Sequence, residues 1–266
     1  TAGITLPLEN IGKVSNQGFD FNVSYGDKIS NDFTYEISLN GGYAKNKIVF
    51  WDEAPGVPEY QKSTGHPMGS TLNYQVIGIF KDQAALDKYP HFATARPGDL
   101  IFEDINNDGM IDGRDRKMDY RSDLPTFTGG LAIDLGYRNF YLSLVMQGAA
   151  GAVRSIYMES EGEGFNYLQQ NVDGRWTPDN TDALKPRAYN RVSDYWRAGV
   201  AWNNTYYRKS NDYLRLRTIE FGYSFPAAAI NKIGLNGLRV YFSGQNLVTL
   251  TGLKDFDPES NYVQVS

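Results

Sequence analysis

The sequence of 266 residues predicts an all-β fold, an antiparallel transmembrane β-barrel portion with long extracellular loops. Three observations lead to this class. Apolar and polar residues alternate along six segments, short and long connections alternate between those segments, and aromatic residues make up 14% of the chain. A barrel strand that faces lipid on one side and a lumen on the other has this half-apolar pattern, and aromatic side chains gather where such strands leave the bilayer.

The alternation predicts six strands of about 10–13 residues each, a length that suits a tilted membrane strand. The apolar rows of the first four are Phe19, Phe21, Val23 and Tyr25; Phe33, Tyr35, Ile37, Leu39 and Tyr43; Phe127, Leu131, Ile133, Leu135 and Tyr137; and Phe140, Leu142, Leu144 and Met146. Two more strands are expected near 213–225 and 237–249, and the apolar row of the first changes face between Leu216 and Ile219. We expect the rows at Phe127, Leu131, Ile133 and Leu135 and at Phe140, Leu142 and Leu144 to point to lipid.

The connections between the strands are of two kinds. Residues 26–32, with a polar turn around 26–28, and residues 138–139 and 226–236 form short connections, whereas 46–124 and 150–212 form long ones. Compact soluble domains rarely hold such long loops. Because antiparallel strands run up and down, the long connections are expected on one side of the sheet, opposite the short ones. A secreted β-sandwich with large insertions is the alternative that the pattern leaves open.

The composition excludes several classes of protein. No apolar run approaches the roughly 20 residues that a membrane helix needs, and the absence of cysteine excludes disulfides. A net charge of −5 argues against nucleic acid as a partner. The two histidines, His66 and His91, lie near no nucleophile motif, so no catalytic set and no enzyme is predicted, although counting carboxylates does not exclude a glycosidase pair. Aromatic residues such as Trp196, Trp202 and Tyr206-Tyr207 could stack on sugar rings or pack a loop.

One twelve-residue segment, 104–115, has the spacing of an EF-hand-like calcium loop. Oxygen ligands are expected from positions 1, 3, 5, 7, 9 and 12, which are Asp104, Asn106, Asp108, the Met110 carbonyl, Asp112 and Asp115. Gly109 at position 6 permits the sharp turn that curls the chain around an ion. We expect a structural Ca²⁺ that orders a long loop with little core of its own. The alternative is a set of Asx turns without metal.

Six groups of residues, in order along the chain, carry a family pattern. They are Asn10-Ile11-Gly12 with Asn16-Gln17-Gly18-Phe19-Asp20; the run from Gly98-Asp99-Leu100 through Asp112, with Asp115-Arg116 after it; Pro125-Thr126-Phe127-Thr128-Gly129-Gly130 with Met146-Gln147-Gly148; Trp176-Thr177-Pro178-Asp179-Asn180 with Pro186-Arg187; Tyr213-Leu214-Arg215-Leu216-Arg217 with Phe221-Gly222-Tyr223-Ser224-Phe225-Pro226; and Gly244-Gln245-Asn246-Leu247 with Asp257-Pro258-Glu259. Each group by itself is weak evidence for a family. Together they resemble the C-terminal barrel of the SusC/RagA family of TonB-dependent transporters over almost the whole chain.

The resemblance implies a fold and a cellular setting. Residues 1–266 would be the C-terminal part of a 22-stranded barrel, and the plug and N-terminal domains of the family are absent from this chain, whose two ends are expected to be cuts through a longer protein. The resemblance further implies the outer membrane of Bacteroidetes-type bacteria and contact with outer-membrane lipid. It also implies a SusD-like surface lipoprotein as partner, and coupling to the TonB complex through parts not in this chain.

The function implied by the resemblance is import of an oligosaccharide or peptide substrate. Two other functions are kept open beside it. The chain could be a secreted β-rich carbohydrate-binding module, or it could be a calcium-dependent glycan hydrolase.

Overall fold

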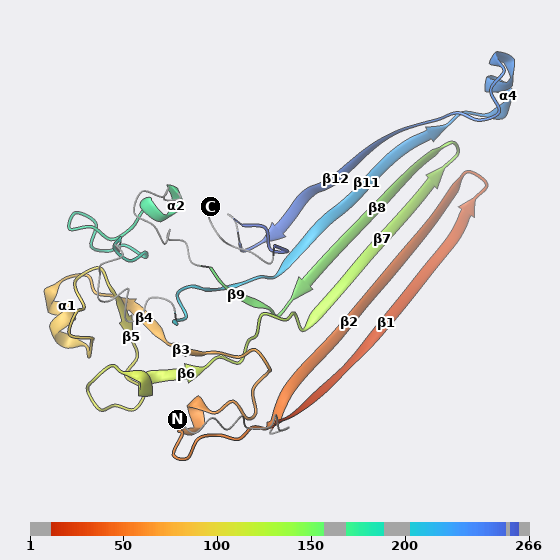
Figure 1. The fold of residues 1–266 in the computed structure, drawn as a ribbon. Helices are drawn as coiled ribbons and strands as arrows, with labels where there is room; N and C mark the ends of the chain where they lie inside the picture. Colours follow the sequence, from red (N-terminus) through yellow and green to blue (C-terminus); the bar gives the residue numbers. More distant parts are fainter. Residues whose placement is uncertain (1–11, 157–168, 189–202, 254–255, 261–266) are drawn as a thin grey trace, which may run out of the picture.

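A computed structural model describes residues 12–156, 169–188, 203–253 and 256–260. Its main element is a six-stranded antiparallel sheet in the order β1-β2-β7-β8-β11-β12 (Figure 1). The strands are β1 (Lys13–Ser30), β2 (Phe33–Phe50), β7 (Phe127–Tyr137), β8 (Phe140–Ala150), β11 (Tyr213–Ser224) and β12 (Arg239–Thr251). The all-β antiparallel class is therefore confirmed. The described strands form an open sheet with β1 and β12 at its edges, so closure into a barrel stays a prediction.

Short and long connections lie at opposite ends of the sheet, as predicted (Figure 1). At one end, two-residue turns join β1 to β2 and β7 to β8, and the short helices α4 (Ala227–Ile230) and η3 (Asn231–Ile233) join β11 to β12. The turn between β7 and β8 places Arg138 at a φ of 53°, in the left-handed region that a tight hairpin uses. The long connections 51–126 and 151–212 leave from the other end.

Two sequence-based expectations about the first two strands are wrong. Strands β1 and β2 have 18 residues each, not 10–13, and the expected turn at 26–28 is part of β1. Gly26 pairs with Glu36 and Lys28 with Thr34, so the chain turns only after Ser30. Polar residues suggest a turn locally, but pairing with β2 satisfies the backbone groups there and extends the strand.

The change of face in β11 comes from a β-bulge. Leu216 pairs with Val248 and Thr218 with Gln245, which leaves Arg217 on β11 outside the ladder. A bulge inserts an extra residue, so the side chains that follow it exchange faces. The apolar row therefore moves from Leu216 to Ile219, as the sequence predicted.

The long connections have a hydrophobic core of their own, which corrects the expectation of a loop with little core. Its buried members are Tyr74, Phe80, Leu86, Ala95, Leu100, Ile101, Phe102 and Ile111, and Tyr206 from the second long connection packs against them. Short elements frame this core: η1 (Glu59–Gln61), β3 (Leu72–Tyr74), β4 (Val76–Ile79), α1 (Gln83–Lys88), β5 (Leu100–Phe102), η2 (Gly113–Asp115), β6 (Arg116–Met118), β9 (Val153–Ser155), α2 (Gln169–Val172) and β10 (Arg208–Ser210). The loops thus form a packed layer at one end of the sheet (Figure 1).

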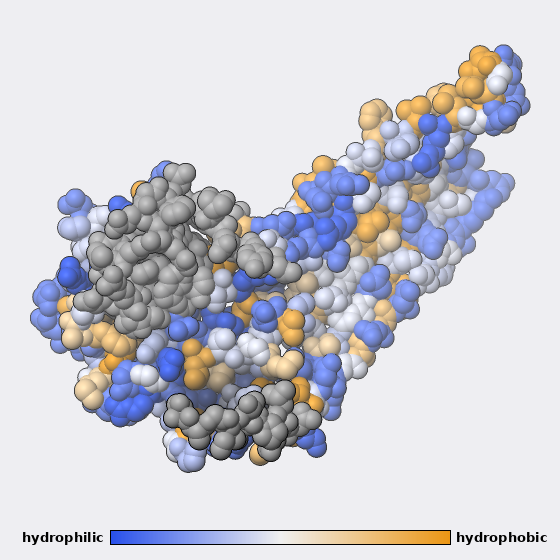
Figure 2. Space-filling model, in the orientation of Figure 1, coloured by the Kyte–Doolittle hydropathy of each residue, from blue (hydrophilic) through white to orange (hydrophobic). Residues whose placement is uncertain are grey.

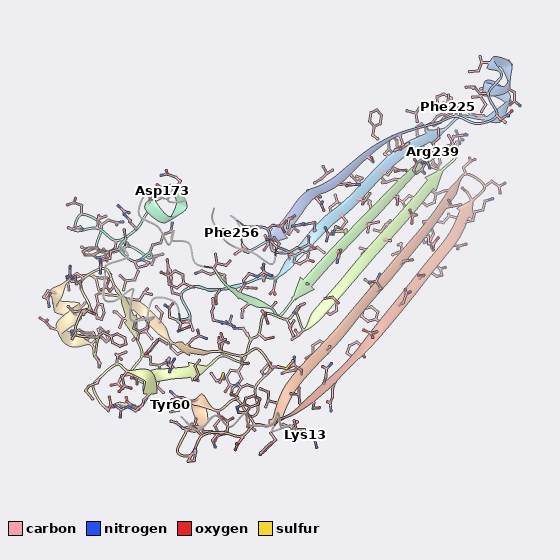
Figure 3. All side chains as sticks on the ribbon, in the orientation of Figure 1. Lys13, Tyr60, Asp173, Phe225, Arg239 and Phe256 are labelled. Atoms are coloured by element: carbon pink, nitrogen blue, oxygen red, sulfur yellow. The ribbon has the colours of Figure 1, made fainter. Side chains whose placement is uncertain are left out.

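The sheet has one apolar face and one polar face. The registers align Ile37 with Ile133 and Leu144, and the neighbouring rows on that face are also apolar. Side chains project from both faces without a covering layer, between the loop end, where Lys13 and Tyr60 lie, and the end with Phe225 and Arg239 (Figure 3). Hydrophobic residues are accordingly exposed along the sheet and around α4 (Figure 2). Among the described helices, none is long and apolar enough to cross a membrane.

Candidate functional site

The predicted calcium loop is closed by hydrogen bonds from its own backbone. The carboxylate of Asp104 accepts from the N–H groups of Asp108 at 3.2 Å and Gly109 at 2.9 Å. The Asn106 side chain accepts from the Asp108 N–H at 3.0 Å, and Asp108 accepts from the Met110 N–H at 3.0 Å. Gly109 has a φ of 80°, the left-handed conformation expected at position 6 of such a loop. The loop therefore curls as the spacing predicted.

The guanidinium of Arg114 lies among the loop's carboxylates. It makes ion pairs of 2.7 Å with both Asp108 and Asp112. The hydrogen bonds from the Arg114 side chain and backbone hold the pKa of Asp112 below its ordinary value. A positive charge is thus already present among the loop's carboxylates, where it offsets their mutual repulsion.

Asp115, at position 12, is fully buried and braces both ends of the loop. Its two oxygens accept from the N–H of Ile105 at 3.0 Å and the N–H of Asp112 at 2.8 Å. Among the residues that the structure describes, no group of three or more His, Asp or Glu side chains is arranged to hold a metal ion. The oxygen chemistry of the loop suits Ca²⁺, but a bound ion would have to replace Arg114 and several backbone contacts. Metal binding stays a prediction.

A buried contact joins the two long connections, and it unites two of the sequence motifs. Arg187 donates to the fully buried Asp99 at 2.6 Å, and its backbone N–H donates to the Gly98 carbonyl at 2.8 Å. The ring of Trp176 lies against Gly98, where an added Cβ would stand 2.5 Å from the Trp176 ring. The Trp176 indole N–H donates to the Lys81 carbonyl at 3.0 Å. Residues near 98 and 176–187 therefore act as one structural unit.

A second contact brings the Arg215 and Arg217 motif against the Asp257 and Glu259 motif. Arg215, with a buried side chain, pairs with Asp257 at 2.6 Å and with Glu259. Arg217, set free by the bulge, pairs with Glu259 and donates to Gln147 at 3.0 Å. These four charged residues fix the segment after β12 to the polar face of the sheet. Sequence spacing did not indicate this pairing, because about 40 residues separate the partners.

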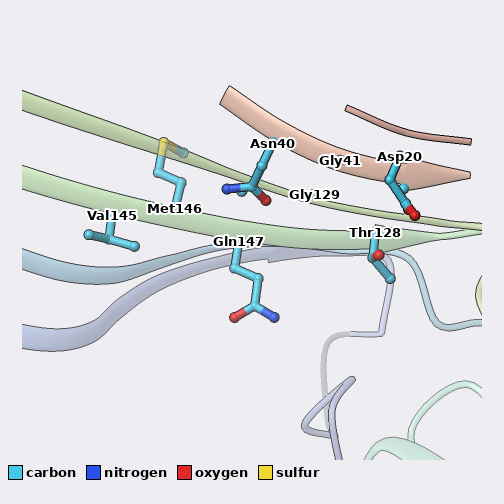
Figure 4. Close-up of a pocket in the computed structure, with 10 residues that line it drawn as sticks. Asp20, Asn40, Gly41, Thr128, Gly129, Val145, Met146 and Gln147 are labelled. Atoms are coloured by element: carbon cyan, nitrogen blue, oxygen red, sulfur yellow. The ribbon is translucent and has the colours of Figure 1, made fainter. Parts of the chain in front are cut away.

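A hollow of about 490 Å³ lies on the polar face near the loop end. The side chains of Asp20, Asn40, Thr128 and Gln147 line it, and they point to the same side of the sheet, whereas Met146 points to the other (Figure 4). None of these residues is among the site residues predicted from the sequence. The polar residues that alternate with the apolar rows do indicate a polar face of the sheet. They do not indicate which polar side chains lie close together on that face.

Among the aromatic candidates, Tyr207 is 2% exposed and Tyr206 packs on the loop core. The packing interpretation therefore fits these two residues. Trp196 and Trp202 lie outside the described residues.

An open antiparallel sheet with one exposed apolar face, one polar face and all long loops at one end has the architecture of a barrel wall. No family model matches the chain. The chain is 30% identical over 280 residues to TonB-dependent receptor P3 of Formosa agariphila, which covers 98% of this chain and 27% of that protein. It is 23% identical over 257 residues to TonB-dependent receptor SusC of Bacteroides thetaiotaomicron, covering 94% of this chain and 24% of that protein.

Solved structures give the same result for the fold. The chain superimposes on the RagAB peptide transporter with a TM-score of 0.68 at 20% identity, covering 94% of this chain and 27% of that one. For the RagAB peptide importer in the closed-closed state the TM-score is 0.65 at 19% identity, with the same shares covered. The expected relationship to SusC/RagA-type TonB-dependent transporters is therefore confirmed. The chain spans about a quarter of the length of these relatives.

Proposed function

We propose that this chain is part of the barrel wall of an outer-membrane importer that is energised by the TonB complex. The apolar face contacts outer-membrane lipid, the polar face lines the substrate path, and the packed loops form the extracellular mouth. A SusD-like surface lipoprotein is the partner at that mouth. The substrate is an oligosaccharide or a peptide.

The observation that carries this proposal is the exposed apolar face of the sheet. Val23, Leu39 and Phe242 on this face are 60%, 46% and 77% exposed, and no described element packs over them. Burying such a face in hydrocarbon removes it from water, and the strand edges are satisfied when neighbouring strands close the sheet. The likeness to receptors and importers supports the same conclusion.

Uptake by living cells tests the proposal. The full-length gene is deleted, and uptake of labelled oligosaccharides and peptides is measured with and without the gene for TonB. We expect loss of uptake of one substrate class in both deletions and recovery when the full-length gene is restored. A full-length protein that fractionates with soluble proteins would contradict the proposal.

We further propose that residues 104–115 bind Ca²⁺ in the full-length protein. Asp104, Asn106, Asp108, the Met110 carbonyl, Asp112 and Asp115 would be the ligands, since hard oxygen donors at this spacing suit Ca²⁺ better than Mg²⁺. The ion would order the loop without a part in catalysis. Arg114 lies between Asp108 and Asp112 and pairs with both. This arrangement indicates that the carboxylates of the loop are stabilised by a nearby positive charge, which supports the proposal.

Calcium titration with two variants separates the ion from the arginine. Asp104→Asn with Asp108→Asn should abolish Ca²⁺ binding measured by calorimetry, whereas Arg114→Gln should strengthen it by removing a competitor. Protection of 98–120 from proteolysis should then depend on Ca²⁺ in the Arg114→Gln protein. Absence of Ca²⁺ binding in both the unmodified and the Arg114→Gln protein would leave the loop as a set of Asx turns.

The two other functions are less well supported. The relatives named above are receptors and transporters, which favours transport over a calcium-dependent glycan hydrolase. A secreted carbohydrate-binding module would need to cover the apolar face within its own fold, and no described element does so.

A further inference from the structure

We propose that the hollow on the polar face is a subsite for a neutral sugar residue of an oligosaccharide. This inference rests on the proposed import function and narrows its substrate class. The hollow lies near the loop end of β7 and β8, because Thr128 is the second residue of β7 and Gln147 is close to the end of β8. A solute that enters between the extracellular loops meets this part of the wall first.

Glycine residues form the floor of the hollow and permit close approach. The carboxylate of Asp20 lies over Gly42, where an added Cβ would stand 2.5 Å from its Oδ1. The amide of Asn40 lies over Gly130 in the same way, at 3.2 Å from the position of an added Cβ. The polar side chains of neighbouring strands therefore lie flat against the sheet, and the hollow remains between these side chains.

The polar groups around the hollow are available to a ligand. In the described part of the chain, the side chains of Asp20, Asn40 and Thr128 have no hydrogen-bond partner. The Oε1 atom of Gln147 accepts from Arg217 at 3.0 Å, which orients its amide and leaves the NH₂ group to donate. The hollow thus offers a carboxylate acceptor, two amides and a hydroxyl within one concave surface, as expected of a site that fixes a small polar group.

This set of groups favours sugar over peptide. Each sugar hydroxyl is both donor and acceptor, so one ring can satisfy carboxylate, amide and hydroxyl groups together. A peptide would gain affinity by pairing with a free strand edge. Of the strands that line the hollow, β2, β7 and β8 are paired on both sides, and the unpaired edge of β1 faces away from β2 and the rest of the hollow. No deep apolar recess or basic side chain lines the hollow to receive a peptide side chain or terminus.

The charge of the hollow favours a neutral sugar. Asp20 contributes a carboxylate, and neither Lys nor Arg is among the lining residues. The two guanidinium groups beside Gln147, those of Arg215 and Arg217, are paired with Asp257 and Glu259. An acidic sugar would therefore meet a like charge without compensation.

Binding to the full-length transporter with its surface partner tests the inference. The probes are neutral oligosaccharides of glucose, fructose, mannose and xylose, uronic-acid oligosaccharides, and short neutral peptides. Asn40→Leu and Asp20→Ala should each weaken the accepted neutral oligosaccharide about tenfold by calorimetry, because each removes a hydrogen-bonding partner. Thr128→Val should weaken it less. Thr34→Val on the same face of β2, near the short turns, is the matched control and should change nothing.

The outcomes separate the inference from the proposed function. Uptake of a neutral oligosaccharide with unchanged affinity in all three hollow variants would overturn the subsite while import stands. Binding of peptides or uronic-acid oligosaccharides that is sensitive to these variants would overturn the neutral-sugar assignment. A correctly assembled complex that imports none of the probes would overturn the proposed function itself, and the inference with it.

Discussion

At the residue scale, single side chains hold the long connections together across large sequence distances. Asp99 and Arg187 are 88 residues apart, and Asp119 and Arg208 are 89 apart. Buried ion pairs of this kind are costly to break, because removal of one partner leaves an unpaired charge out of water. The loops therefore depend on a few specific residues rather than on area alone.

Gly98 is one such residue, and Gly98→Ala should destabilise the loop layer. Its φ is 90°, and an added Cβ would stand 2.5 Å from the Trp176 ring and 2.8 Å from the Arg187 Cβ. We expect a loss of about 3 kcal/mol, from backbone strain together with the steric clash. Thermal unfolding of the full-length protein measures it. Gly56→Ala is the control, since Gly56 has a φ of 82° and open space around it; equal losses at both positions would show that packing against Trp176 is unimportant.

Asp119 should make the loop layer sensitive to acid. Burial alone would raise the pKa of Asp119, but hydrogen bonds from Arg121 and the charges of Arg121 and Arg208 outweigh it and hold the pKa below its ordinary value. A lowered pKa in the folded state means that the stabilisation is complete above the unfolded value of about 4 and is lost as pH falls through the lower folded value.

Asp119→Asn checks this directly. At neutral pH the variant should lose about 3 kcal/mol, because Arg208 is only 7% exposed and loses its charged partner. The difference from the unmodified protein should shrink as pH falls below about 4. Asp182→Asn is the control, because its pair with Lys81 is exposed and contributes little. A difference that does not change with pH would refute the role of the charge.

At the element scale, the alternation of the strands creates two faces with different surroundings. Ile133 on β7 belongs to the apolar face, and its neighbour Ala132 belongs to the polar face. Ile133→Arg should hinder assembly by roughly 2–4 kcal/mol if the apolar face meets lipid. Ala132→Arg, one residue away, should be tolerated because its side chain lies on the polar face. Folding into liposomes with a heat-modifiable gel shift measures both, and equal effects would contradict the assignment of the faces.

At the scale of the whole molecule, the separation of long and short connections predicts an orientation in the membrane. The 266 residues contain no cysteine, so single cysteines report position without interference from this segment. Leu184, in the second long connection, is 88% exposed, and Ile233, near the short connections, is 68% exposed. Two variants are made, Leu184→Cys and Ile233→Cys. On intact cells, an impermeant maleimide should label the first and should label the second only after permeabilisation. The reverse pattern would invert the proposed orientation.

The sequence by itself determined the features that depend on near neighbours. The period-2 rows at Phe127–Tyr137 and Phe140 onward fixed which side chains share a face, and Arg138-Asn139 fixed a hairpin. Those signals are local, because a strand's side chains alternate regardless of what pairs with it. The same local reasoning located the curled loop around Gly109, whose turn needs only its own residues.

Only the tertiary structure decided the features that depend on distant partners. The extension of β1 through Gly26 to Lys28 required the register of β2. The counter-charge of Asp257 comes from Arg215, and that of Asp99 comes from Arg187. Likewise, the hollow exists because Asp20 and Asn40 lie over glycines of neighbouring strands. Sequence spacing does not indicate such contacts, because they form only when strand pairing brings residues that are distant in the sequence close together.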